Sequence, residues 1–162
     1  MKDKKVKFLF VVYTGILIWV ILLKLGFSFE NLHKIGRTIN LIPFHINQSS
    51  DIFTYDAVLN FLIFIPFGVV LKMLNVHSEK AIKYGFLFSL CMETIQYIFA
   101  IGCADITDVI TNTAGTCFGV LLYVWLKKCF HEEKLCSFLC YTGIVLSCIF
   151  IILSVAFNLF YR

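Results

Sequence analysis

The sequence predicts an all-α fold, namely a polytopic transmembrane bundle of about five helices. Of the 162 residues, 60% are hydrophobic and 15% are charged, whereas soluble domains contain about 45–50% apolar residues. Five long apolar runs hold most of the chain, and each can cross a hydrocarbon layer of ~30 Å at ~1.5 Å per residue. We therefore expect residues 1–162 to form one membrane domain, without a separate catalytic or nucleic-acid-binding domain.

The predicted spans cover residues 8–23, 57–74, 82–101, 109–126 and 135–160. The first span follows a lysine-rich start, as a secretory signal does, but no small-x-small cleavage motif follows it, so we expect an uncleaved anchor. The long connection at residues 26–56 is the one predicted long loop, and Ser50 and Asp51 can cap a helix that runs into the second span. The first and fifth spans are almost free of polar side chains, so we expect them to face lipid.

The positions of the basic residues predict the orientation of the spans. Cytoplasmic segments of membrane proteins carry an excess of Lys and Arg. With the N-terminus inside, ten of the fourteen basic residues are cytoplasmic: Lys2, Lys4, Lys5, Lys7, Lys72, Lys80, Lys83, Lys127, Lys128 and Lys134. Only Lys24, Lys34, Arg37 and Arg162 are then outside. We expect a multi-pass membrane protein, with its C-terminus and the long loop outside.

Polar side chains gather at the outer ends of three predicted spans. Glu93 and Gln96 lie three residues apart on the third span, and hence on one helical face. A second set follows with the spacing i, i+3, i+7 into the fourth span, and consists of Asp105, Asp108 and Asn112. Asn60 lies near the outer end of the second span. Polar groups inside a bilayer are costly and are candidates for function by default.

Helix rise places these groups at the depth of a lipid headgroup and its first methylenes. Glu93 lies ~12 Å below the outer boundary, Gln96 ~8 Å, and Asn60 and Asn112 each ~5 Å. For the two asparagines, hydrogen bonding between helices is an equally good explanation. An ionised Glu93 needs a cation, and no Lys or Arg lies in the central part of a span, so Arg37 on the outer loop is the expected partner of Glu93 or of the aspartates.

The remaining motifs carry less chemical information. Gly115 and Gly119 form a GxxxG pattern that brings helices close together; it fits packing within one chain better than a homo-oligomer, although both stay open. The seven cysteines and four histidines show no metal-ligand spacing or CxxC, and no nucleophile motif or phosphate-binding glycine loop is present. The sequence predicts no cofactor and no metal.

In order and spacing, several motifs resemble those of the VanZ family. They are Asn40-Leu41-Ile42-Pro43-Phe44, Asp56-x3-Asn60, Phe64-Ile65-Pro66-Phe67-Gly68, Glu93-x2-Gln96 and Asp105-x2-Asp108-x3-Asn112-x2-Gly115-x3-Gly119. The match covers roughly the first four spans. Many family members carry an arginine three residues before the first aspartate, where this chain has Gly102, and this departure favours Arg37 as the counter-ion.

The resemblance implies an integral membrane protein of Gram-positive bacteria that reduces susceptibility to teicoplanin-type lipoglycopeptides, independently of the enzymes that rebuild the wall precursor. We expect an outer-leaflet pocket that engages a lipid-anchored ligand, either the drug or a lipid-linked wall precursor. The expected binding residues are Arg37, Asn40, Asn60, Glu93, Gln96, Asp105, Asp108 and Asn112. The alternative is a membrane-embedded enzyme that modifies a lipid-linked or surface substrate, with Glu93 as general acid or base and Asp105 and Asp108 binding the substrate or a divalent cation. A transporter is a third, weaker option, because five spans without repeat symmetry do not make a complete monomeric one.

Overall fold

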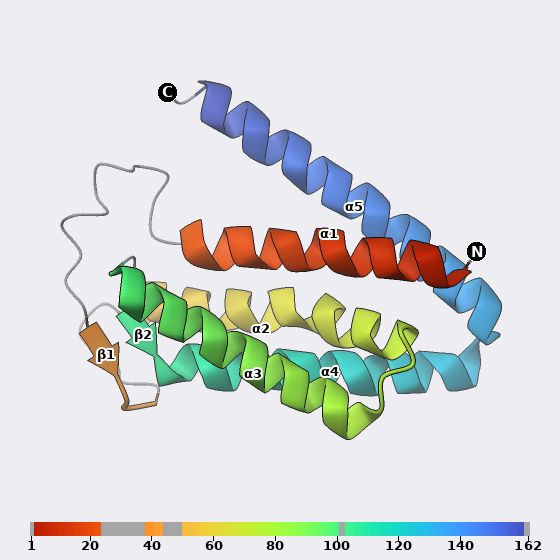
Figure 1. The fold of residues 1–162 in the computed structure, drawn as a ribbon, viewed down its shortest axis with the longest axis horizontal. Helices are drawn as coiled ribbons and strands as arrows, with labels where there is room; N and C mark the ends of the chain where they lie inside the picture. Colours follow the sequence, from red (N-terminus) through yellow and green to blue (C-terminus); the bar gives the residue numbers. More distant parts are fainter. Residues whose placement is uncertain (1, 24–37, 44–49, 101–102, 161–162) are drawn as a thin grey trace.

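The computed structural model describes residues 2–23, 38–43, 50–100 and 103–160 as a bundle of five α-helices (Figure 1). The helices are α1 (Lys2–Leu23), α2 (Ser50–Met73), α3 (Ser78–Phe99), α4 (Ile106–Cys129) and α5 (Glu132–Phe160). Each contains most of one predicted span, so the all-helical prediction is confirmed. In Figure 1, α1, α3 and α5 run in one direction, and α2 and α4 run in the other.

Within the residues that the structure describes, three helices are long and apolar enough to cross a membrane, over Tyr55–Met73, Ile106–Cys129 and Glu132–Ala156. The other two were also predicted as spans. In α1, four lysines (Lys2, Lys4, Lys5 and Lys7) occupy the first two turns, and in α3 the hydropathy is lowered by Lys83, Glu93 and Gln96. These two helices nevertheless pack lengthwise against the rest of the bundle (Figure 1).

Several helix boundaries differ from the predicted spans by a few residues, and two of these differences lie at the polar end of the bundle. The helix that leads into the second span begins at Ser50, so residues 50–56 do not belong to the predicted loop, and the capping role expected of Ser50 and Asp51 stays a prediction. At the other place, α3 ends at Phe99 rather than at residue 101. Ala100 adopts the left-handed conformation (φ 54°), and its N–H donates to the carbonyl groups of Gln96 and Tyr97. A left-handed residue after the last helical position is a common way to end a helix.

Two short strands were not predicted. β1 (Thr38–Asn40) lies in the segment expected to be loop, and β2 (Cys103–Asp105) precedes α4. They pair in parallel, with Asn40 opposite Asp105, at the end of the bundle where α3 ends and α4 begins (Figure 1). The polar ends of the predicted spans are therefore tied to part of the long loop by backbone pairing.

The closest helix contact joins α2 and α4 through glycines. A Cβ atom on Gly115 would overlap the carbonyl oxygen of Phe61, one on Gly119 would overlap that of Ile65, and one on Gly68 would overlap that of Thr116. From Gly115 to Gly119 along α4, the partner residue on α2 changes from Phe61 to Ile65. The two helices are therefore neighbours that run in the same direction. Packing within one chain, the first of the two roles expected for the GxxxG pair, accounts for both glycines.

The remaining helices pack around this pair. Phe64 and Phe67 on α2 contact Phe88 on α3, with ring centroids of Phe67 and Phe88 5.2 Å apart. Leu17 and Ile21 of α1 are buried in the same cluster. α1 therefore packs one side against the bundle and exposes the other, where Val11 is 67% exposed, and most of α5 is exposed.

The α2–α4 contact predicts a specific packing defect. Gly119→Ala places a methyl group against the Ile65 carbonyl, which is backbone and cannot move alone, so we expect a loss of about 1–3 kcal/mol in stability. Gly15→Ala on α1 is the matched control, because no atom lies within 4 Å of a Cβ there. Thermal unfolding of the two variants in detergent checks this. Equal midpoints for both variants would contradict the packing argument.

Candidate functional site

Asp105 is the centre of the polar site at the end of the bundle. Its Oδ1 accepts the Thr107 N–H at 2.7 Å and so caps the start of α4. Its Oδ2 accepts the Asn40 side-chain amide at 3.0 Å, and its own N–H donates to Glu93 Oε2 at 3.0 Å. One residue thereby joins β1, α3 and α4, and both of its carboxylate oxygens accept hydrogen bonds.

This geometry corrects one detail of the predicted stripe. Asp105 has extended backbone angles (φ −119°, ψ 124°) and precedes the first helical residue, so it does not share a helical face with the other two members. Asp108 and Asn112 do lie on α4, one turn apart. Asp108 is half-buried in the first turn, where a negative charge interacts favourably with the helix dipole.

Glu93 is 5% exposed and comes from the buried face of α3. The Asp105 N–H is one of its partners, and burial of a carboxylate is costly unless such donors face it. Asn40, in turn, accepts the Ile42 N–H on its Oδ1 at 3.2 Å, which shapes the chain after β1. The structure thus brings together Glu93, Asp105 and Asn40, three of the predicted residues, through direct contacts.

A second polar contact lies one turn deeper between α3 and α4. Asn112, which is 1% exposed, donates its amide to the hydroxyl of Ser89 at 2.8 Å. Below it, Thr116 donates to the Asn112 carbonyl at 3.0 Å and faces Gly85 on α3. Sequence reasoning missed Ser89 and Thr116. The four-residue spacing of Gly85, Ser89 and Glu93 was the signal, because it places small and polar residues on one face.

Gln96 connects the site to the end of α1. Its Nε2 donates to the Ile21 carbonyl at 3.0 Å, and this carbonyl lies in the last turn of α1, where backbone acceptors have no partner within the helix. The Gln96 amide group cannot be reversed, since its oxygen would then face the Ile21 carbonyl oxygen.

Asn60 is also buried and lies on α2. It is next to Phe61, which packs against Gly115, so it lies near the level of Asn112.

Two buried acceptors at this end of the bundle have no hydrogen-bond partner within the described residues. They are Gln96 Oε1 and Asn112 Oδ1. Buried polar atoms in proteins are nearly always paired with protein groups, water or a ligand. The contacts within the described residues therefore leave hydrogen-bonding capacity unused on these two oxygens. Arg37, the predicted counter-ion, lies outside the described residues, as do residues 26–37 of the predicted loop.

Comparisons with known proteins agree with this arrangement of motifs. The VanZ/LLP1 family model matches residues 10–127, a range that includes α2, α3, both strands and most of α1 and α4. Protein VanZ of Enterococcus faecium is 38% identical over 143 residues, which cover 85% of each chain. No solved structure matches. The family model and the extent of this identity show that the chain belongs to the VanZ family.

Proposed function

We propose that this protein reduces the susceptibility of a Gram-positive cell to teicoplanin-type lipoglycopeptides by engaging a lipid-anchored ligand at its outer polar site. Membership of the VanZ family supports the phenotype. The observation that carries the mechanism is the pair of buried amide oxygens, on Gln96 and Asn112, that have no donor within the described residues. Hydroxyl and amide groups of a sugar-bearing or peptide-bearing head can satisfy them.

The head of the ligand would enter at the end of the bundle where Asp105 joins β1, α3 and α4. Glu93, Asp105 and Asn40 form a connected set of hydrogen bonds, and Asp108 adds a second carboxylate one turn into α4. Side chains that are already held in place by hydrogen bonds lose less conformational entropy when a ligand binds. We include Arg37 in the site as the positively charged contributor from the outer loop.

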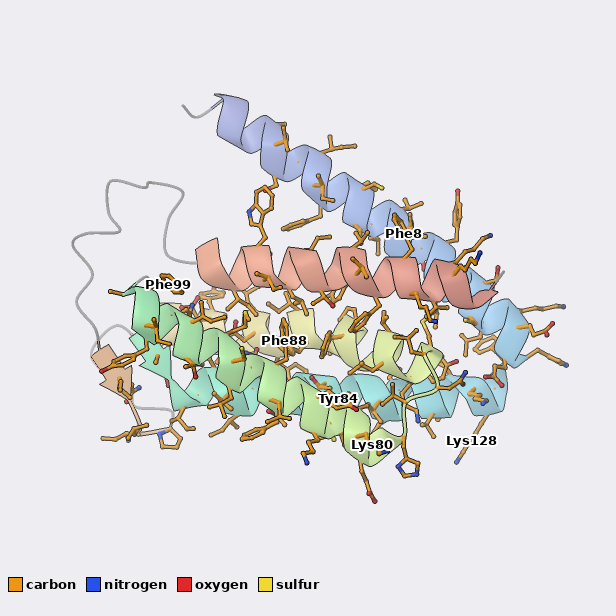
Figure 2. All side chains as sticks on the ribbon, viewed as in Figure 1. Phe8, Lys80, Tyr84, Phe88, Phe99 and Lys128 are labelled. Carbon is orange, nitrogen blue, oxygen red and sulfur yellow. The ribbon has the colours of Figure 1, made fainter. Side chains whose placement is uncertain are left out.

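The membrane orientation is part of this proposal. Every lysine among the described residues lies where α1, α3 and α5 begin or where α2 and α4 end. Figure 2 shows Lys80 and Lys128 near this end, with Phe99 at the opposite end, close to the strands. By the excess of positive charge in cytoplasmic segments, the lysine-rich end is inside and the polar site is outside, with all five helices crossing the membrane.

Cysteine labelling tests this orientation. Cys129 is exposed at the last position of α4, and Leu41 is exposed beside β1. In a background without other cysteines, a membrane-impermeant maleimide added to intact cells should label Leu41→Cys and leave Cys129 unlabelled. Opening the cells should make Cys129 reactive. Labelling of Cys129 in intact cells would place the polar site inside and exclude the proposal.

Charge removal at Glu93 tests the site itself. Glu93→Gln keeps an oxygen that can accept the Asp105 N–H but removes the negative charge, so we expect a folded protein whose teicoplanin resistance falls to the level of the host. Glu79→Gln is the matched control, because Glu79 is an exposed carboxylate in the first turn of the same helix, at its opposite end. The measurement is the minimum inhibitory concentration at equal membrane abundance, with vancomycin as the drug without an acyl chain. Full resistance in Glu93→Gln would refute the proposed role.

The enzyme hypothesis makes a different prediction for the products in the cell. In an enzyme, Glu93 would exchange a proton with a substrate. Mass spectrometry of lipid-linked precursors and wall polymers should then show a new species in cells that express the wild type but not Glu93→Gln. Both oxygens of Asp105 already accept hydrogen bonds from Thr107 and Asn40. This arrangement suits a structural role better than cation binding, so we expect unchanged products.

A further inference from the structure

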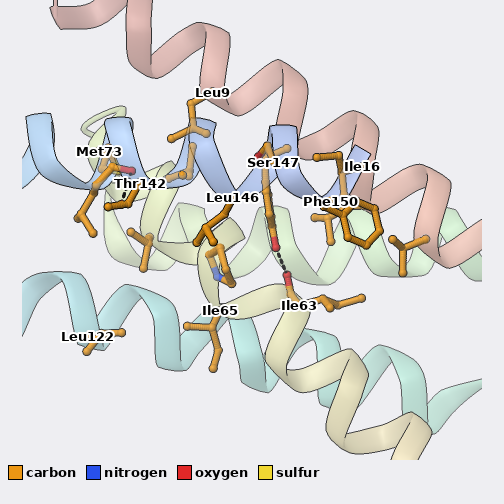
Figure 3. Close-up of a pocket in the computed structure, with 18 residues that line it drawn as sticks. Leu9, Ile16, Ile63, Ile65, Met73, Leu122, Thr142, Leu146, Ser147 and Phe150 are labelled. Atoms are coloured by element: carbon orange, nitrogen blue, oxygen red, sulfur yellow. Dashed lines mark hydrogen bonds between the residues drawn. The ribbon is translucent and has the colours of Figure 1, made fainter. Parts of the chain in front are cut away.

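A cavity of about 460 Å³ lies between α1, α2 and α5 (Figure 3). This volume falls within the ~300–1,000 Å³ of typical small-molecule sites. None of its eighteen lining residues is charged, and only Tyr13, Thr142 and Ser147 carry a polar side-chain atom. The cavity takes its lining from one sequence motif only, through Ile65 and Pro66, and none of the expected binding residues lines it.

The cavity follows from one proline and from the course of α5. Pro66 lines the cavity. Because proline has no N–H, the Leu62 carbonyl lacks its usual backbone hydrogen bond at this turn of α2. Gly143 of α5 approaches Leu9 of α1, with 3.1 Å between a Cβ built there and the leucine methyl groups. Beyond that contact α5 diverges from α1 (Figure 1), and the space between them is not filled by side chains.

Two of the three polar side chains of the wall donate to the protein backbone. Tyr13 donates its hydroxyl to the Ile63 carbonyl at 2.6 Å, the bond drawn in Figure 3. Thr142 donates to the Phe138 carbonyl at 2.9 Å, as threonines in membrane helices often do. Apart from the Ser147 hydroxyl and the Met73 sulfur, the surface that remains consists of aliphatic and aromatic carbon. A molecule in this cavity can bury apolar surface but can form few hydrogen bonds. The chemical group that suits the cavity is therefore a hydrocarbon chain.

The position of the cavity relates it to the polar site. Along α1 it extends from Leu9 to Val20, a distance of ~16 Å by helix rise. Val20 is followed by Ile21, whose carbonyl accepts the amide of Gln96. On α2, Ile63 at the cavity wall lies three residues after the buried Asn60, and hence on the same helical face. The outer end of the cavity therefore adjoins residues of the polar site, and its rim includes the exposed Leu146 in the apolar part of α5.

We propose that this cavity holds the hydrocarbon chain of a membrane lipid-linked molecule whose polar head lies at the outer polar site. The proposal rests on the function proposed above and gives its ligand a second point of recognition. A chain can enter from the bilayer past Leu146 without crossing water. Head and tail contacts of one amphiphile would then run continuously from Asn60 and Gln96 to Leu9.

Photolabelling of the full-length protein in phospholipid nanodiscs tests the tail site. The probe is phosphatidylglycerol with a diazirine in one acyl chain, and labelled peptides are identified by mass spectrometry. Ile16→Trp and Leu146→Trp fill the cavity from two sides, whereas Val11→Trp adds the same bulk to an exposed position of α1 that does not line it. We expect labelling of α1 and α5 in the wild type, a several-fold decrease in both filled variants, and no change in Val11→Trp. Equal labelling of all four proteins would overturn the proposal.

Resistance assays on the same variants separate this inference from the proposed function. We expect teicoplanin resistance to be lost in Ile16→Trp and Leu146→Trp at normal abundance and retained in Val11→Trp. Loss of resistance in Glu93→Gln, together with full resistance in both filled variants, would overturn the tail site and leave the polar site standing. Full resistance in Glu93→Gln would instead overturn the proposed function. Competition against the photoprobe by added teicoplanin, but not by vancomycin, would assign the cavity to the drug's acyl chain and overturn the lipid assignment.

Discussion

The close approach of α2 and α4 is the contact on which the rest of the bundle depends. At three glycines, Gly68, Gly115 and Gly119, the two backbones approach so closely that a Cβ atom would overlap a carbonyl oxygen of the facing helix. In lipid, the association of helices relies on such packing and on hydrogen bonds, because their apolar side chains gain little from leaving a hydrocarbon solvent. Because α2 and α4 are parallel, Asn60 and Asn112 lie at a similar level near the ends where these helices begin. α3 contributes further polar side chains to the site.

Asp105 shows how a charged residue can serve the architecture and a binding site together. Its carboxylate caps α4 and holds Asn40, while its backbone N–H faces Glu93. The loop segment of β1 is thereby fixed over the helix ends. The ligand-binding proposal requires this fixed frame, but it assigns the contacts with the ligand to groups that retain hydrogen-bonding capacity, such as the amide oxygens of Gln96 and Asn112.

The sequence was sufficient to predict the helices, because long apolar runs and their polar ends are local features. It also indicated the gathering of Glu93, Asn40 and Asp105 through their shared motifs, although not their contacts. The β1–β2 pairing could not be predicted, since two three-residue strands separated by more than sixty positions carry no periodic signal. The hydrogen bond from Gln96 to Ile21 depends on where α1 ends relative to α3. The cavity depends on the divergence of α5, which apolar composition does not determine.

The parallel arrangement of α2 and α4 has a consequence for biogenesis. Gly115 and Gly119 are translated more than fifty residues after Phe61 and Ile65, their partners on α2. At synthesis rates of ~5–20 residues per second, α2 exists for several seconds before α4 emerges. During that interval the amide of Asn60 lacks the neighbours that bury it in the finished bundle. The order of translation therefore requires α2 to wait for α4, and it makes the nascent chain with two or three helices the stage most exposed to misassembly or to capture by quality-control proteases.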